Sequence, residues 1–193
     1  MRRVCVFCGS SPGRDPRYVA AAREMALALV ARGEGLVFGG GSVGLMGVLA
    51  DALLAAGGEA LGVIPHGLVA REIAHRSLTE MRVVPSMHAR KALMAELSDA
   101  FVALPGGFGT FEELLEMVTW AQLRIHRKPI GLLNVAGYYD SLIALVDHAV
   151  REGFVPPGNR GLILVDGEPG PLLDRLSAYQ SPARPEWITP GEA

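Results

Sequence analysis

Residues 104–113, Leu-Pro-Gly-Gly-Phe-Gly-Thr-Phe-Glu-Glu, constrain the fold of this chain more than any other stretch. Residues 99–104 lead into it as a short apolar run without helical period, which predicts a buried strand. In residues 111–123, apolar side chains recur at the i, i+3, i+4, i+7 spacing of an amphipathic helix. The glycines between them allow the backbone to approach a ligand closely. A strand, a glycine turn and a helix N-terminus together favour binding of an anion such as phosphate.

Thr110 and Glu113 match a capping box, in which the glutamate reaches back to the N–H of the threonine. A purely structural role and a functional role both stay open for this pair. The two roles are compatible, because the helix dipole keeps a carboxylate at the N-terminus ionised. An ionised glutamate is a poor proton donor, so the functional alternative is a base or a negative charge that faces a developing cation.

Short apolar segments alternate with helical patterns along the rest of the chain. Strands are predicted at residues 3–8, 36–38, 60–64, 81–84, 99–104, 129–135 and 162–165, and helices at 18–32, 45–56, 87–97, 111–123, 139–152 and 171–178. This order predicts an α/β fold: a Rossmann-like, doubly wound parallel sheet of about seven strands with helices on both faces. We expect one nucleotide-binding domain over residues 1–180 and a tail at 181–193.

Three glycine-bearing loops, at residues 9–13, 39–44 and 105–110, each follow a predicted strand. They are therefore expected to line one crevice at the carboxyl edge of the sheet. The second loop fits the G-x-G-x-x-G pattern, but it follows the second strand, and the nearest acid, Glu59, begins the third strand. A dinucleotide site needs the pattern after the first strand, so an NAD site is not predicted, although the loop suits a phosphate or a ribose.

Composition excludes several classes of protein. No apolar run approaches the roughly 18 residues of a membrane span, and the apolar part of the N-terminus is too short for a signal peptide. The net charge of −2 argues against nucleic-acid binding. Cys5 and Cys8 lie in the first apolar strand without a second pair, which predicts buried, reduced thiols in the cytoplasm. The five histidines show no metal-ligand spacing, so no metal is predicted.

Arg90 and Lys91 lie side by side in the predicted helix that follows Ser86. A solvated basic face is one interpretation of this pair. The other is a ligand site, because the planar guanidinium of Arg90 can bind a phosphate or a carboxylate at two points. For Glu72, the interpretation that corresponds to the solvated basic face is an ordinary surface acid.

The combination of Met87-His88-x-Arg90-Lys91 with Pro105-Gly-Gly-x-Gly-Thr-x-x-Glu113 resembles the paired signature of the LONELY GUY (LOG) family. These enzymes are cytokinin riboside 5′-monophosphate phosphoribohydrolases that were long labelled lysine decarboxylases. The resemblance extends over most of the chain to about residue 160, and it includes further matches at residues 8–11, 39–47, 71–73 and 119–122.

The resemblance implies hydrolysis of the N-glycosidic bond of AMP or an N6-isopentenyl AMP, without a cofactor, in a homodimer with its site at the interface. It places the catalytic pair on Arg90 and Glu113. The predicted substrate-binding residues are Glu72, Lys91, Gly106, Gly107, Phe108, Gly109, Thr110, Phe111, Glu112 and Thr119, together with Gly9, Ser10, Gly40, Gly41 and Ser42 from the other two loops.

The expected chemistry agrees with this assignment, because cleavage of a glycosidic bond develops positive charge on the ribose that an ionised carboxylate stabilises. A lysine decarboxylase is rejected, since Lys91 and Lys128 are the only lysines and neither lies in a recognisable pyridoxal phosphate setting. The alternative is a non-catalytic nucleotide or cofactor carrier on the same fold, because fold does not fix function.

Overall fold

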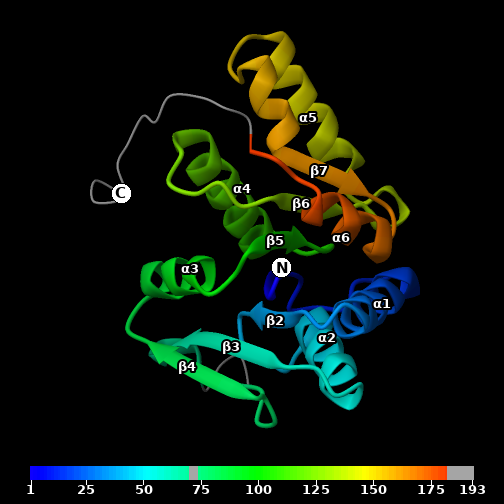
Figure 1. The fold of residues 1–193 in the computed structure, drawn as a ribbon, viewed down its shortest axis with the longest axis vertical. Helices are drawn as coiled ribbons and strands as arrows, with labels where there is room; N and C mark the ends of the chain where they lie inside the picture. The colour runs from blue at the N-terminus through cyan, green and yellow to red at the C-terminus, as the bar shows by residue number, and fades with distance from the viewer. Residues whose placement is uncertain (70–73, 182–193) are drawn as a thin grey trace.

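The predicted strands form one parallel sheet in the computed structural model, which describes residues 1–69 and 74–181 (Figure 1). The strands are β1 (Arg3–Phe7), β2 (Gly35–Phe38), β3 (Ala60–Pro65), β4 (Glu80–Val84), β5 (Ala100–Ala103), β6 (Ile130–Leu133) and β7 (Ile163–Asp166). Their order in the sheet is β4-β3-β2-β1-β5-β6-β7, and every pair of neighbours is parallel. The predicted seven-stranded, doubly wound fold is confirmed.

Helices cover both faces of this sheet. One face carries α1 (Pro16–Ala31), α2 (Gly44–Ala55) and α6 (Pro169–Ser177), and the other carries α3 (Met87–Glu96), α4 (Phe108–Leu123) and α5 (Asp140–Arg151), as Figure 1 shows. Short 3₁₀ turns occur at η1 (His66–Leu68), η2 (Val135–Gly137) and η3 (Pro157–Leu162). Side-chain caps stabilise the starts of α1 and α3: the Asp15 carboxylate accepts from the N–H of Arg17, and the Ser86 hydroxyl accepts from the N–H of Ala89.

The alternation of side chains along β1 divides the core into two layers. Val4 and Val6 pack with α1, α2 and α6, whereas Cys5 and Phe7 pack with α3, α4 and α5. Successive residues of a strand point to opposite faces, so a strand buried on both faces is apolar throughout. This explains why the first strand reads as a continuous apolar run. Cys5 and Cys8 are free, buried thiols, as predicted.

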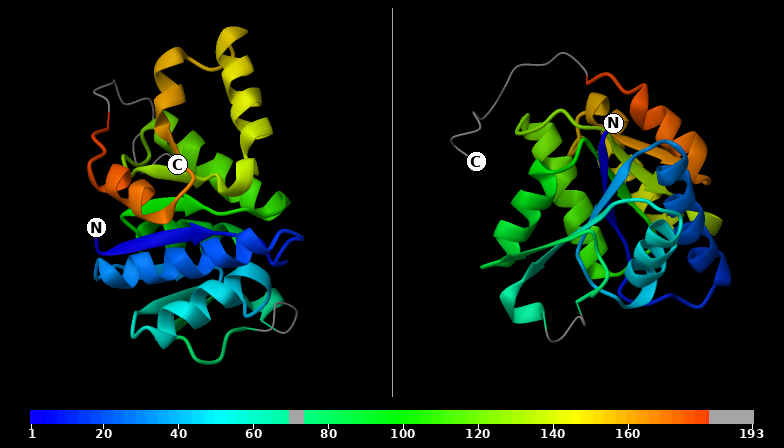
Figure 2. Two further views of the ribbon diagram at one scale, coloured as in Figure 1. Left: turned by 90° about the vertical axis from the view of Figure 1, so that its right-hand side faces the viewer. Right: turned by 60° about the horizontal axis from the view of Figure 1, so that its bottom comes forward.

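The order of the strands reverses at β1, which is the neighbour of both β2 and β5. Strands β2 to β4 extend the sheet on one side of β1, and strands β5 to β7 extend it on the other side. Ligands of open parallel sheets bind outside the carboxyl ends of the strands at such a switch point. In Figure 2 (left), β1 runs from the N-terminus toward the opposite edge of the sheet, where the loops after β1, β2 and β5 emerge. Of the helices in the described ranges, none combines the length and the hydropathy of a membrane span. Residues 182–193 of the predicted tail lie outside the described residues.

Candidate active site

The three glycine-bearing loops meet through direct backbone contacts. The N–H of Gly9 donates to the carbonyl oxygen of Pro105 over 3.1 Å, and the N–H of Leu45 donates to the carbonyl oxygen of Gly9 over 2.9 Å. A Cβ on Gly44 would lie 2.3 Å from the carbonyl carbon of Ser10, so this contact requires a glycine. The expected meeting of the loops after β1, β2 and β5 is therefore present, and it frames the carboxyl edge of the sheet.

Arg90 and Glu113 come together at this edge from different helices. Arg90 lies in the first turns of α3, Glu113 lies in α4, and Arg90 Nη2 is 3.7 Å from Glu113 Oε1. The two residues are 6% and 9% exposed, so the pair is held in a largely water-excluded place. Opposite charges at this distance attract far more strongly there than on a solvated surface. The solvated basic face considered for Arg90 is thus wrong, because the side chain is buried.

Gly39, the first residue after β2, provides room for the guanidinium of Arg90. A Cβ at this position would lie 1.9 Å from Arg90 Nη2. The glycine loop after β2 therefore contributes the space that lets Arg90 reach Glu113. The sequence marked Gly40, Gly41 and Ser42 as candidate binding residues, but it gave no reason to select Gly39.

The predicted capping box is wrong. Helix α4 begins at Phe108 with Gly107 as its N-cap, and no side chain caps it. Thr110 consequently lies within the first helical turn, where its side chain is buried against Gly106; a Cβ on Gly106 would approach Thr110 Oγ1 to 2.1 Å. A glycine cap requires no side-chain acceptor, so the helix can start at Phe108, two residues before the threonine.

This shift changes the interpretation of Glu113. Its position in the second turn of α4 is beyond the first turn, within which the helix dipole acts. The nearby positive charge comes instead from Arg90. Burial and then the negative charge of Glu113 raise the pKa of the Cys8 thiol, which therefore stays protonated. The capping role is removed, and Glu113 is a buried carboxylate beside an arginine.

A pocket of about 270 Å³ opens between the loops after β1 and β5. Four predicted binding residues line it: Gly9, Ser10, Gly106 and Gly107. Two further lining residues, Tyr18 and Tyr138, were missed by the sequence analysis. Tyr138 follows β6, the neighbour of β5, so the strand order was the signal that could have pointed to it.

Lys91 is bound by two carboxylates of α4. Its ammonium donates to Glu112 and, over 3.0 Å, to Glu116. Burial alone would lower the pKa of Lys91, but the hydrogen bonds to Glu112 and Glu116 outweigh it and raise the pKa above its ordinary value. The structure thus joins two predicted substrate-binding residues, Lys91 and Glu112, to each other, and this contact ties α3 to α4.

The other predicted binding residues are placed differently. Phe108 is 93% exposed, and Phe111 packs in part against Tyr138 and Tyr139. Thr119 is exposed, and its hydroxyl donates to the carbonyl oxygen of Leu115 within α4.

Gly40 and Gly41 contact the segment that precedes β4. The N–H of His75 donates to the carbonyl oxygen of Gly40, and Gly41 forms a bridge with Ala74. A Cβ added to Gly109 would meet no atom within 4 Å, so this part of the turn is open. Ser42 precedes α2 at the same edge, and Glu72 lies outside the described residues.

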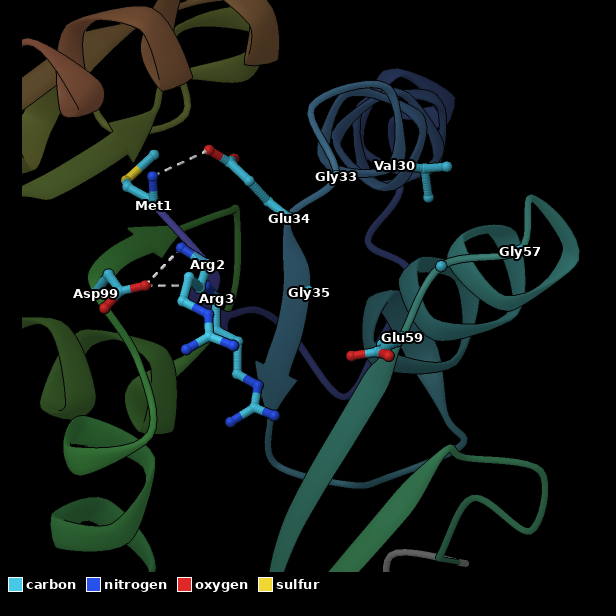
Figure 3. Close-up of a pocket in the computed structure, with 11 residues that line it drawn as sticks. Met1, Arg2, Arg3, Val30, Gly33, Glu34, Gly35, Gly57, Glu59 and Asp99 are labelled. Atoms are coloured by element: carbon cyan, nitrogen blue, oxygen red, sulfur yellow. Dashed lines mark hydrogen bonds and ion pairs between the residues drawn. The ribbon is translucent and has the colours of Figure 1, made fainter.

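A larger pocket of about 580 Å³ lies at the opposite, amino edge of the sheet (Figure 3). Two of its acids pair within the protein: Asp99 accepts from the N–H groups of Arg2 and Arg3, and Glu34 forms ion pairs with the N-terminal ammonium and with Arg32. None of the three glycine-bearing loops contributes to it, whereas two of them line the smaller pocket. Size therefore does not identify the functional pocket here, and the smaller pocket at the switch point is the better candidate.

A scan against protein-family models matches residues 46–176 to the family described as "possible lysine decarboxylase". Among curated proteins, the chain is 58% identical over 181 residues to LOGL5 of Oryza sativa subsp. japonica, named a probable cytokinin riboside 5′-monophosphate phosphoribohydrolase; the match covers 94% of this chain and 74% of that protein. LOG7 of Arabidopsis thaliana, named a cytokinin riboside 5′-monophosphate phosphoribohydrolase, is 52% identical over 93% of this chain and 82% of its own length.

Two solved structures resemble this one at low sequence identity. The molybdenum cofactor carrier protein of Chlamydomonas reinhardtii aligns with a TM-score of 0.68 at 22% identity, over 92% of this chain and 99% of that chain. The molybdenum cofactor binding protein of Rippkaea orientalis aligns with a TM-score of 0.70 at 18% identity, over 92% and 97%. These likenesses show a shared fold, which does not by itself determine a shared function.

Proposed function

We propose that this chain, which belongs to the LOG family of cytokinin riboside 5′-monophosphate phosphoribohydrolases, hydrolyses the N-glycosidic bond of AMP or of an N6-substituted AMP. The products are the free base and ribose 5-phosphate, which makes the protein an N-glycosidase. One observation carries the proposal for the site: Arg90 and Glu113 form a buried pair at the switch point, beside the glycine turn that opens α4.

In the proposed reaction, the bond between the ribose carbon C1′ and the base nitrogen breaks, and its electron pair leaves with the base. Positive charge develops on the ribose, and the Glu113 carboxylate stabilises it. A water molecule forms the new bond to C1′ and loses a proton to Glu113, while the departing base gains a proton. Arg90 orients the carboxylate of Glu113 and offsets its charge in the free protein.

The 5′-phosphate is assigned to the start of α4. Glycine leaves this helix start open, because a Cβ on Gly107 or Gly109 would meet no atom within 4 Å. N–H groups at a helix N-terminus, with the positive end of the helix dipole behind them, suit a phosphate. Gly9 and Ser10 approach the same place from the loop after β1 and line the adjoining pocket.

The words "lysine decarboxylase" in the family description do not fit the lysines of this chain. A pyridoxal phosphate enzyme needs a lysine that is available to form a Schiff base. The Lys91 ammonium is bound between Glu112 and Glu116, and the Lys128 ammonium donates to the carbonyl oxygen of Ala95. Lys128 also precedes β6, so it lies at the amino edge, away from the glycine loops.

A second copy of the chain is proposed to complete the site. Thr119 is twelve residues beyond the N-cap of α4, about 18 Å along the helix axis, and its side chain faces outward. Leu115 shares this outward face and is 43% exposed, which suits contact with another apolar surface. A homodimer that packs on this face would bring Thr119 toward the partner's crevice and bury Leu115.

The assay that tests this function is incubation of the purified protein with AMP and with N6-isopentenyl AMP, followed by chromatography for the free base. Release of adenine or isopentenyladenine together with an equal amount of ribose 5-phosphate supports the proposal. Tight binding of either nucleotide without release of a base would instead favour the carrier alternative.

A further inference from the structure

We infer that Tyr138 is a positioning residue for the 5′-phosphate, because it orients and polarises the peptide between Gly106 and Gly107. The inference rests on the proposed function for the chemistry of the ligand. It begins from a direct contact: the phenol O–H of Tyr138 donates to the carbonyl oxygen of Gly106. Tyr138 also lines the pocket that Gly106 and Gly107 share with the loop after β1.

Three consecutive carbonyl groups of the glycine turn each accept a hydrogen bond from outside it. The Leu104 carbonyl accepts from the Tyr139 phenol over 2.6 Å, the Pro105 carbonyl from the N–H of Gly9, and the Gly106 carbonyl from Tyr138. The turn between β5 and α4 is therefore fixed before any ligand arrives. Preorganised donors contribute more to binding than donors that must be ordered on binding.

The N–H on the other side of the Gly106–Gly107 peptide is available to a ligand. Among the described residues, no acceptor is found for the N–H of Gly107, the N-cap residue of α4. The C=O and the N–H of a planar trans peptide point in opposite directions, so a bond that fixes one fixes the other. A carbonyl that accepts a hydrogen bond also polarises its peptide, which makes the N–H a better donor to an anion.

The loop after β6 is built to present the two tyrosines. The side chain of Asn134 accepts from the N–H of Tyr139 and donates to Asp140, which fixes the start of α5. The ring of Tyr138 packs edge-on against Tyr18, at 5.6 Å between centroids, and against Tyr139, at 4.9 Å. These contacts hold the ring by its carbon atoms, so removal of the hydroxyl alone leaves the packing intact.

Tyr139 provides a matched control because its phenol makes the same kind of bond to a different peptide. The carbonyl of Leu104 belongs to the Leu104–Pro105 peptide, and proline has no N–H. The Tyr139 bond therefore polarises no donor. The variants Tyr138→Phe and Tyr139→Phe each remove one phenol hydrogen bond to the same turn, but only Tyr138→Phe weakens a donor to the ligand.

Calorimetric titration with ribose 5-phosphate tests the inference, because this ligand carries the phosphate and has no base to release. Tyr138→Phe is expected to raise the Kd of ribose 5-phosphate about fivefold, and the KM for AMP in parallel, with kcat changed less than twofold. Tyr139→Phe is expected to keep the Kd within twofold of the wild type and to lower the melting temperature.

Equal Kd values for the wild type and Tyr138→Phe would overturn the inference. An equal rise of the Kd in Tyr138→Phe and Tyr139→Phe would also overturn it, and so would a wild type that does not bind ribose 5-phosphate. The proposed function fails separately, if the wild type releases no base from either nucleotide. A fivefold effect of Tyr138→Phe on ribose 5-phosphate binding would support the inference even in that case.

Discussion

His126 shows how strongly burial acts on a single titratable residue in this fold. Its ring contacts Phe101, and Nδ1 accepts from the N–H of Lys128, so the proton lies on Nε2, which donates to the carbonyl oxygen of Met117. Burial, aided by the charge of Lys128 and opposed by the Met117 carbonyl, lowers the pKa of His126 to about 4. The folded protein thus holds this histidine neutral in conditions where the unfolded chain would protonate it.

The free energy of unfolding should consequently decrease as the pH is lowered, because of this residue. Above the unfolded pKa of about 6.5 both states are neutral and the full stability is present. As the pH falls from there toward 4, only the unfolded state binds the proton, and about 1–2 kcal/mol is lost between pH 7 and pH 5. Urea unfolding at the two pH values checks this, with His126→Asn expected to lose less over the interval. An equal loss in both proteins would contradict it.

At the scale of an element, the turn that precedes α4 has no room for a side chain at Gly106 but has room for one at Gly107. A Cβ on Gly106 would lie 2.1 Å from Thr110 Oγ1 and 2.9 Å from the backbone nitrogen of Gly9, whereas one on Gly107 would meet no atom within 4 Å. Gly106→Ala should therefore cost about 2–3 kcal/mol of unfolding free energy, and Gly107→Ala under about 1 kcal/mol. Comparison of the two melting curves checks this, and equal losses would show that the turn is not packed as described.

Prediction from the sequence succeeded for elements and partly failed for their ends. Apolar runs located all seven strands of the described residues, and the pattern is plainest in β2, β3, β5 and β6, which are buried on both faces. The first residue of α4 was misplaced, because the choice of Gly107 over Thr110 as N-cap depends on how the Thr110 side chain packs against Gly106, a contact that the sequence pattern does not record.

The sequence motifs predicted part of the candidate site. Arg90 and Glu113 were named from the sequence, and the structure brings them to 3.7 Å. Tyr138 was not named, because its role follows from strand order: β6 lies next to β5, and only that neighbourhood carries the phenol to the Gly106 carbonyl.

At the scale of the whole molecule, the prediction is that the outward face of α4 forms a dimer interface. If Leu115 and Thr119 lie in a dimer interface, the wild type should sediment at twice the chain mass of 20.5 kDa, and Leu115→Arg should shift it to the monomer with loss of base release. Leu27→Arg is the matched control, because Leu27 is 53% exposed on α1, which covers the other face of the sheet. A monomeric wild type with full activity would rule out a shared site.

The most direct test of the central claim is the rate of base release by Glu113→Gln. Glutamine keeps the size of the side chain and an oxygen for Arg90, and it removes only the negative charge that is proposed to face the ribose. We expect a variant that melts within a few degrees of the wild type and releases base with kcat lower by about 10²-fold or more. A folded Glu113→Gln variant that turns over at close to the wild-type rate would contradict the account.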